Sequence, residues 1–188
     1  MKLPSMIKGW FNPDINPESL LASYYSTGKS KYLSLLVEQF NLSLFHYLVS
    51  QSNKETAEDV LQSTWLKVIK TKNNAKGHTN VKGWLFTIAR NALIDELRRQ
   101  QKWQWQGVHE GLVASNTLEK QLESYDRLAS FNQALEQLPF HQREVFILQQ
   151  EGFSLMEIAQ LTHEEFEAVK SRLRYARTNI KKILGPKL

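Results

Sequence analysis

The chain has 188 residues, of which 41% are hydrophobic and 23% charged, and it contains no cysteine. This length fits one large domain or two small ones, and the lack of cysteine excludes disulfide scaffolds, thiolate catalysis and cysteine-bound zinc. The formal net charge is +5. No apolar run approaches the roughly 20 residues that cross a membrane, so we expect a cytoplasmic protein without membrane insertion.

The charge is unevenly distributed along the chain. Residues 1–105 carry 14 basic and 8 acidic side chains, and residues 106–169 carry 3 basic and 11 acidic ones. Residues 170–188 carry 7 basic side chains and no acidic one. Two basic segments on either side of an acidic one indicate two places for a polyanion, and solvated helix faces are the alternative.

Helical periodicity recurs along the chain, and no strand pattern appears. Asn16 precedes Pro17, and four further residues stand three positions before a glutamate: Ser52, Asn116, Ser154 and Thr162. A side-chain oxygen at such a position accepts a bond from a free N–H at the start of a helix. These patterns predict helices over residues 17–28, 31–50, 54–71, 80–102, 117–137, 140–151, 155–161 and 165–183.

The segment WQWQGVHEGLVAS, which begins at Trp103, has no clean period and follows a long predicted helix. We therefore predict an all-α fold of two helical domains joined by a flexible linker. The expected divisions are an N-terminal extension (1–16), a helical bundle (17–102), the linker (103–116) and a second domain (117–188).

The predicted helix over 80–102 has one apolar face and one polar face. The apolar face, which we expect to be buried, is formed by Leu85, Ile88, Ala89, Ala92, Leu93 and Leu97. The polar row is formed by Thr87, Asn91, Asp95, Arg98 or Arg99, and Lys102. Asparagine can bond base edges and arginine can bind phosphate, so this row is a candidate nucleic-acid face, with a solvated face as the alternative.

The loop before this helix is basic and rich in small polar residues. Five lysines and no acid lie between Lys67 and Lys82. A basic loop beside a polar helix face suits single-stranded or distorted nucleic acid. An ordinary soluble loop is the alternative.

The predicted helix over 54–71 also has two faces. Its inward stripe is Val60, Leu61, Thr64 and Val68, and a second face carries Asp59, Gln62, Ser63 and Leu66. Polar groups mixed with an exposed leucine are suited to docking another protein.

Near the C-terminus, a short helix from Ser154 to Leu161 is followed by a turn over residues 162–165 and a basic helix. We expect Phe166, Val169, Leu173 and Ala176 to point inward, and Lys170, Ser171, Arg172, Arg174 and Arg177 to point outward. Two helices joined by a tight turn, the second rich in arginine, are typical of a DNA-binding helix-turn-helix. A helical hairpin with a basic outer face is the alternative.

These segments resemble the extracytoplasmic-function group of bacterial sigma factors in the sigma-70 family. Region 2 of the family is matched by LLASYYSTGKSKYLSLLVEQF, AEDVLQSTWLKV and WLFTIARNALIDELRR, and region 4 by ALEQLPFHQREVFILQQEGFSLMEIAQL and VKSRLRYAR. The resemblance covers about residues 20–102 and 128–183 in the family's order. It implies a protein that binds core RNA polymerase, recognises the −10 and −35 promoter elements and promotes promoter opening.

The resemblance also implies partners and location. The expected partners are bacterial core RNA polymerase, promoter DNA and an anti-sigma factor. The expected location is the cytoplasm, at the nucleoid through RNA polymerase. No catalytic residue, cofactor or metal is expected.

Residue roles follow from the resemblance position by position. The positions that dock on the polymerase clamp are matched by Asp59 and Gln62, and we include their neighbours Ser63 and Leu66. The loop 73–82 matches the one that captures a flipped base, so the expected −10 set is Asn74, Lys76, His78, Asn80, Thr87, Asn91, Asp95, Arg98 and Arg99. The expected −35 set is Lys170, Ser171 and Arg172 in the major groove, with Arg174 and Arg177 on phosphate.

The chain departs from the family pattern at a few positions. Ser63 stands where the family usually has glutamate, and His163 stands where the helix-turn-helix usually has glycine. Glu164, Glu165 and Glu167 add three acids near the DNA-facing end.

Two other classes of function stay open at this point: a helix-turn-helix DNA-binding regulator that does not direct initiation, and a partner-binding module on the same scaffold. An enzyme is disfavoured because the five histidines are scattered and no HExxH, phosphate-binding loop or nucleophile elbow is present.

Overall fold

The structure is a computed structural model that describes residues 16–71, 79–106 and 123–185. Within these ranges the chain forms eight α-helices and no strand. The N-terminal domain contains α1 (Pro17–Thr27), α2 (Ser30–Gln51), α3 (Lys54–Lys70) and α4 (Val81–Gln106). The C-terminal domain contains α5 (Glu123–Glu136), α6 (Phe140–Gln150), α7 (Leu155–Thr162) and α8 (Phe166–Leu184). The predicted all-α fold of two helical domains is confirmed.

Two of the predicted helix starts are confirmed. Asn16 caps α1 by accepting bonds from the N–H groups of Glu18 and Ser19, at 2.8 and 3.2 Å. Ser154 and Glu157 form the predicted reciprocal capping box at the start of α7. The predicted start of α5, with Asn116, lies outside the described residues.

Two other predicted capping boxes are wrong. Asn53 rather than Ser52 caps α3, because the Ser52 hydroxyl donates back to the Leu48 carbonyl at 2.8 Å. The Thr162 hydroxyl likewise donates to the Ile158 carbonyl at 2.7 Å, so Thr162 ends α7 and does not begin α8. In both cases the local bond to the preceding turn competes with the capping bond.

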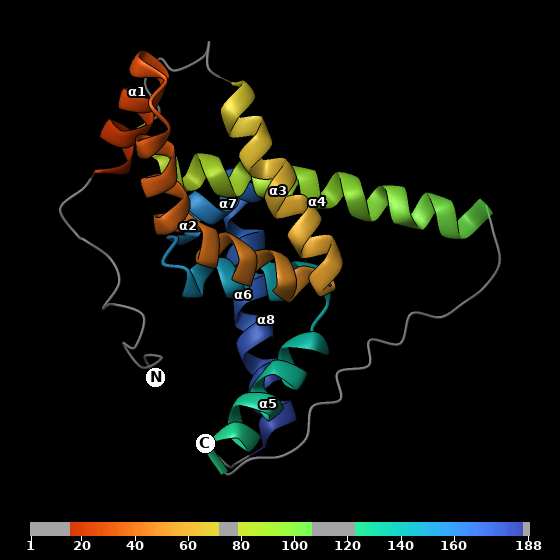
Figure 1. The fold of residues 1–188 in the computed structure, drawn as a ribbon. Coiled ribbons are helices and arrows are strands. Elements are labelled where there is room, and N and C mark those ends of the chain that lie inside the picture. Colours follow the sequence, from red (N-terminus) through yellow and green to blue (C-terminus); the bar gives the residue numbers. More distant parts are fainter. Residues whose placement is uncertain (1–15, 72–78, 107–122, 186–188) are drawn as a thin grey trace.

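The N-terminal domain has its core between α2, α3 and α4 (Figure 1). Leu44 and Leu48 of α2 are fully buried, and so are Leu85, Ala89 and Leu93 on the predicted apolar face of α4. Complete burial of each leucine side chain stabilises the fold by about 1.5–3 kcal/mol. The helix α4 continues to Gln106, so the first four residues of the predicted linker are helical.

The C-terminal domain packs α6 and α7 against the long helix α8. Val169, Leu173 and Ala176 are buried as predicted, but the prediction for Phe166 is wrong because its side chain is 37% exposed. Phe166 is the first residue of α8, and α7 has already ended at Thr162, so the neighbouring helix does not extend far enough to cover it.

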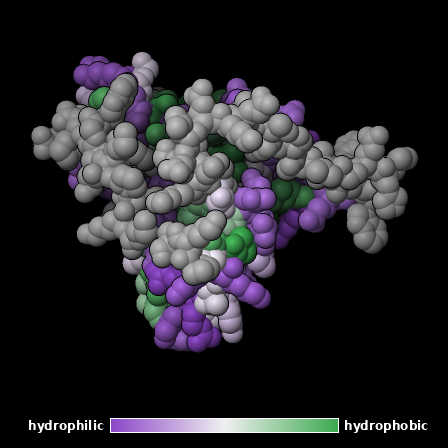
Figure 2. All heavy atoms as spheres, turned by 90° about the horizontal axis from the view of Figure 1, so that it is seen from below, coloured by the Kyte–Doolittle hydropathy of each residue, from purple (hydrophilic) through white to green (hydrophobic). Residues whose placement is uncertain are grey.

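The two domains pack directly on each other. In Figure 1, α6 and α7 lie behind and beneath α2 and α4, and α5 and α8 extend away from the N-terminal domain. The rings of Phe86 in α4 and Phe153 before α7 meet edge to face, with their centroids 4.9 Å apart. Seen from below in Figure 2, hydrophilic side chains cover most of the described surface, and apolar ones gather in small areas.

Candidate nucleic-acid and protein-docking surfaces

The polar row predicted on α4 is open to solvent. Asn91, Asp95 and Arg98 are exposed, and Thr87 is half-buried with its hydroxyl donating to the Gly83 carbonyl at 2.8 Å. Because helical residues recur every 3.6 positions, these side chains lie on the side of α4 away from Leu85, Ala89 and Leu93. The row therefore presents amide, carboxylate and guanidinium groups together on one accessible face.

The two arginines at the end of this row behave differently. Arg98 is seven positions from Asn91 and lies on the same row. Arg99 bonds Glu96, three positions earlier on the same helix, through Nε and Nη2, at 2.9 and 2.8 Å. The Arg99 bond holds the pKa of the Glu96 carboxyl below its usual value. Arg98 is thus the arginine that accompanies Asn91 and Asp95.

The loop before α4 is described only at its end. Asn74, Lys76 and His78 lie outside the described residues. The Asn80 side chain accepts from the Gly83 N–H at 2.7 Å and donates to Glu157 of α7 at 3.2 Å. A Cβ at Gly83 would lie only 3.0 Å from Asn80 Nδ2, so the glycine makes room for this cap. Asn80 therefore caps α4 and also links the two domains.

The predicted docking face of α3 is exposed to solvent. Asp59, Gln62, Ser63 and Leu66 all reach solvent, and the Leu66 side chain is 47% exposed. Asp59 and Gln62 border a shallow groove between α2 and α3 whose other lining residues are Asn41, Glu58, Leu61 and Trp65. Trp65 Nε1 donates to Asn41 Oδ1 at 3.0 Å and so fixes one helix against the other. This face combines an acidic rim with apolar side chains.

The predicted DNA face of α8 is divided by helix geometry. Lys170, Ser171 and Arg172 are consecutive, so they fan over about 200° of the helix circumference and cannot share one direction. Lys170, Arg174 and Arg177 are exposed, and Ser171 is half-buried. Arg172 lies on the flank of the helix, where Nη1 is 2.7 Å from Glu164 Oε1.

Two of the three acids that depart from the family pattern, Glu164 and Glu167, are partners of these cations. Glu167 Oε1 lies 3.3 Å from Lys170 Nζ, one turn away on α8. The Arg172 guanidinium holds the pKa of the Glu164 carboxyl below its usual value. Further along α8, Arg177 Nη2 donates to Gln149 of α6 at 2.8 Å. The positive charge of the first turns of α8 is therefore partly compensated by acids of the same helix-turn-helix.

His163 occupies a position that favours glycine. Its φ is 57°, in the left-handed region, and it ends α7. A residue with a Cβ costs roughly 1–2 kcal/mol more than glycine there. The structure thus gives a physical reason for the glycine that the family usually has at this turn.

A buried ion pair between the two domains was not foreseen from the sequence. Arg90 of α4 donates to both carboxylate oxygens of Glu144 of α6, at 2.8 and 3.3 Å, and the Glu144 side chain is 1% exposed. The Tyr47 hydroxyl donates to the same carboxylate at 2.9 Å. Burial, with Glu144 as a second cause, raises the pKa of Tyr47 well above its ordinary value. No local pattern marks these residues, because 54 positions separate Arg90 from Glu144.

Further contacts extend this domain interface. Lys82 Nζ bonds the Glu151 carbonyl and lies 4.8 Å from the centre of the Phe153 ring. Burial lowers the pKa of Lys82. At the other end of the interface, Arg143 Nε donates to the Gln51 side chain at 3.3 Å. The interface leaves the Asn91 row of α4 exposed.

Comparison with known proteins shows which family the chain belongs to. The family model for sigma-70 region 2 matches residues 36–103, and the model for sigma-70, region 4 matches residues 128–180. The RNA polymerase sigma factor CarQ of Myxococcus xanthus is 30% identical over 134 residues, which are 71% of this chain and 77% of that protein. The chain belongs to the sigma-70 family. The family predicted from the motifs is confirmed, and its members are transcription initiation factors.

Other relatives place the chain among the extracytoplasmic-function sigma factors. The RNA polymerase sigma factor YlaC of Bacillus subtilis is 28% identical and covers 78% of this chain and 88% of its own length. The ECF RNA polymerase sigma factor SigX of the same organism is also 28% identical, covering 73% and 75%. The chain is thus an RNA polymerase sigma factor of this group.

Two solved structures share the fold. The sigma factor RpoE of Bartonella quintana, in complex with the anti-sigma factor NepR, has a TM-score of 0.64 and 26% identity over 85% of this chain and 100% of that chain. CnrH, in complex with the cytosolic domain of CnrY, has a TM-score of 0.65 and 21% identity, over 92% and 100%. In the described ranges of this sigma factor, no helix is long and apolar enough to span a bilayer.

Proposed function

We propose that this sigma factor docks on core RNA polymerase through α3, holds the melted −10 element with α4 and its preceding loop, and contacts the −35 element with α8. The exposed row of Asn91, Asp95 and Arg98, opposite the buried face of α4, is the observation that supports this best. The proposed domains are residues 17–106 and 117–188, joined by 107–116, since α4 continues to Gln106. The proposed site of action is the cytoplasm, at the nucleoid through RNA polymerase.

At the −10 element the task is to hold a base outside the stack, which costs a few kcal/mol. The Asn91 amide can donate to and accept from a base edge, and Asp95 can accept from an exocyclic amino group. Arg98, which lies on the same row, supplies a cation for the phosphates. Asn74, Lys76 and His78 of the loop complete the proposed set through their match to the family, with Asn80 and Thr87 at the start of α4 and Arg99 at its flank.

For polymerase docking we assign Asp59, Gln62, Ser63 and Leu66. All four are exposed on one helix, beside the groove that Trp65 and Asn41 hold in shape. Ser63 is shorter than the glutamate that the family usually has, so the acidic contribution to docking falls mainly on Asp59 and the neighbouring Glu58.

At the −35 element we assign Lys170, Ser171, Arg174 and Arg177 to the DNA-facing side of α8, with Arg172 on its flank. Four of these five side chains are cationic, so they suit phosphate or guanine. Weak DNA binding by each domain becomes sufficient once both are held on one large enzyme, because the second contact is then intramolecular.

The packed domains cannot reach both elements at once. The elements lie about 25 base pairs apart, or roughly 85 Å at 3.4 Å per pair. The helices α4 and α8 have 26 and 19 residues, or roughly 39 and 28 Å, and their domains are in contact. We infer that the domains separate for initiation and that the Arg90–Glu144 pair breaks when they do. An anti-sigma factor is the proposed partner that would hold the two domains in contact. The similar sigma factor RpoE is in complex with one, NepR.

Reconstitution tests the proposal. The purified full chain, mixed with sigma-free bacterial core polymerase, is expected to co-elute with it and to give promoter-specific transcripts from a genomic library. The double variant Asp59→Ala with Gln62→Ala should lose co-elution, whereas Glu55→Ala, an exposed acid on the same helix, should keep it. A folded chain that fails to bind core polymerase would contradict the proposal.

The second candidate function is a DNA-binding regulator that does not direct initiation. The compensation of Lys170 and Arg172 by acids of their own domain counts against it, because those acids compete with DNA for the two cations. Salt-dependent binding of duplex DNA by the chain alone, with no co-elution with polymerase, would support it.

A further inference from the structure

A histidine stands beside the buried ion pair that joins the two domains. His141 is the second residue of α6, and its Nδ1 lies 3.8 Å from Oε2 of Glu144, one turn further on. The His141 side chain is 53% exposed, whereas that of Glu144 is 1% exposed. The imidazole can therefore exchange a proton with solvent while it faces a carboxylate that is closed to solvent. None of the proposed docking or DNA contacts uses His141.

The Glu144 carboxylate is shared by groups from three helices. Arg90 of α4 donates to both of its oxygens, at 2.8 and 3.3 Å, and the Tyr47 hydroxyl of α2 donates to Oε1 at 2.9 Å. His141 approaches Oε2, the oxygen that accepts the longer of the two Arg90 bonds. Arg90 belongs to the N-terminal domain and His141 to the C-terminal domain. A protonated His141 and Arg90 are thus two cations, one from each domain, that compete for one carboxylate.

The other charges close to His141 belong to its own domain. Glu164 precedes α8, and Arg172 is the main cause of its lowered pKa, to which the charges of His141 and Arg90 add. Since Glu164 and Arg172 stay with His141 when the domains separate, their influence on it is common to both forms of the chain. Only the loss of Arg90 and Tyr47 distinguishes the two forms.

The remaining charged groups of the helices around α6 are engaged elsewhere. Arg143 of α6 donates to a side chain of α2, Glu157 of α7 accepts from its own N-cap residue, and Arg177 of α8 donates to the far end of α6. Glu157 is the only ionisable residue of α7. The exposed His163, in the turn beside Glu164, is the other histidine near this part of the molecule. It therefore serves as a control below.

Separation of the domains changes the charge that His141 faces. In the packed form Arg90 neutralises Glu144, so a proton on His141 gains little attraction and meets a second cation. In the separated form Arg90 is gone, and the carboxylate can pair with His141 alone. His141 therefore binds a proton more tightly in the separated form. By linkage, proton binding must then favour separation to the same extent.

We propose that His141 makes the domain interface sensitive to pH: a proton on His141 draws the Glu144 carboxylate away from Arg90 and favours the separated form. This inference rests on the proposed separation of the domains for initiation. Histidine side chains ordinarily gain their proton near pH 6.5, so the shift is expected between about pH 7.5 and about pH 5.5. It is absent above this range and complete below it. Acidification thus moves the free sigma factor toward the form that can span both promoter elements.

Single-molecule energy transfer counts packed and separated molecules directly. The chain has no cysteine, so Lys54→Cys in α3 and Lys182→Cys in α8 would give one exposed dye position on each domain of the full chain. The ratio of separated to packed molecules should rise roughly 2- to 5-fold from about pH 7.5 to about pH 5.5, as expected for one half-exposed charge contact. His141→Gln should keep the ratio constant, and His141→Lys should raise it already at the higher pH.

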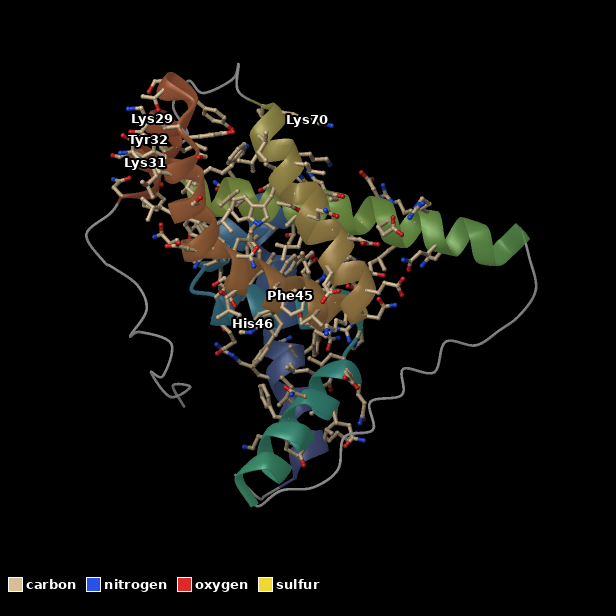
Figure 3. All side chains as sticks on the ribbon, viewed as in Figure 1. Lys29, Lys31, Tyr32, Phe45, His46 and Lys70 are labelled. Carbon is tan, nitrogen blue, oxygen red and sulfur yellow. The ribbon has the colours of Figure 1, made fainter. Side chains whose placement is uncertain are left out.

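Two histidine variants are the matched controls. His46 projects from α2 into solvent (Figure 3), and His163 has a positive φ that suits glycine. His46→Gln and His163→Gly should both keep the wild-type response. A response that is lost in either control, or that persists in His141→Gln, would overturn the role of His141.

The measurement is independent of the proposed function because it uses neither polymerase nor DNA. A wild-type ratio that does not change with pH overturns the pH sensitivity, and co-elution with core polymerase would still support the sigma-factor assignment. Conversely, a pH-sensitive ratio in a chain that fails to bind core polymerase would support the role of His141 and contradict the proposed docking.

Discussion

The two proposed DNA faces of this sigma factor differ in how their charged groups are occupied. On α4, Glu96 engages Arg99 at the flank of the helix, and this leaves Asn91, Asp95 and Arg98 exposed on the central row. On α8, Glu164 and Glu167 engage Arg172 and Lys170 within the recognition helix-turn-helix itself. The acids of α4 thus leave the DNA face available, whereas those of α8 compete with DNA for its cations.

We therefore expect the two domains to contribute unequally to promoter binding. The row on α4 needs no internal ion pair to be broken before it contacts a base. The first turns of α8 exchange an existing ion pair for a phosphate contact, and the net gain is therefore smaller. We expect the −10 element to contribute more specificity than the −35 element.

The largest effect is expected where the two domains meet. Glu144→Ala leaves the Arg90 guanidinium buried without its partner, and such a loss costs about 3–5 kcal/mol. We expect the domains to separate while each stays helical. Small-angle scattering should show a larger radius of gyration, with little change in circular dichroism. Glu151→Ala removes an acid near the same interface whose carboxylate forms no ion pair within the described residues, and it is the control. An unchanged radius of gyration in Glu144→Ala would show that the Arg90–Glu144 pair does not hold the two domains together.

The next effect concerns the α4 row. Asn91→Ala should reduce promoter opening at the −10 element by roughly 5- to 150-fold, because a good base contact is worth about 1–3 kcal/mol. Binding to core polymerase should not change. Permanganate reactivity of unpaired thymines measures opening, and Gln101→Ala, which is exposed on α4 but off the row, is the matched control. Normal opening in Asn91→Ala would remove this residue from the site.

Substitutions on α8 should have a smaller effect on DNA binding, and this effect should differ between Arg172 and Arg174. Arg174→Ala should lower the salt slope of −35 duplex binding by the holoenzyme by about 0.9, as expected for one lost phosphate contact. Arg172→Ala should also weaken binding, but less, since its guanidinium is already held by Glu164 at 2.7 Å. Titrations of both variants over a range of salt test this order. A larger loss in Arg172→Ala would show that the flank, rather than the exposed face, meets the DNA.

The smallest effect is the pH dependence of the Arg172–Glu164 pair. Arg172 depresses the pKa of Glu164 in the folded chain, so the pair stabilises the fold above the unfolded pKa of glutamate. That contribution is lost as the pH falls through the lower, folded value. Partly exposed pairs contribute at most about 1 kcal/mol. Chemical unfolding of wild type and Glu164→Gln should therefore differ slightly at neutral pH and converge in acid, once the pH has fallen through the lowered pKa of Glu164. A difference that persists in acid would contradict this assignment.

The helix-turn-helix shows how far sequence patterns reach. The box formed by Ser154 and Glu157 was predicted correctly because both partners lie within one helical turn. Thr162 matches the same pattern, yet its hydroxyl bonds the preceding turn at Ile158. The two sequence patterns are the same. Whether the hydroxyl caps the next helix or bonds the preceding turn depends on where the previous helix ends. Likewise, the sequence predicted that Arg172 points outward with Lys170 and Arg174, but the turn places Glu164 beside Arg172.

The family, the all-α fold and the faces of α3 and α4 could be predicted from the sequence, because helical periodicity and motif spacing are local properties of the chain. The sequence also predicted which polar rows would be exposed. The partners of Glu144 and the flank position of Arg172 follow from packing and could not be foreseen. These arrangements join residues that are distant in the chain, and packing of apolar faces, rather than any local pattern, brings them together.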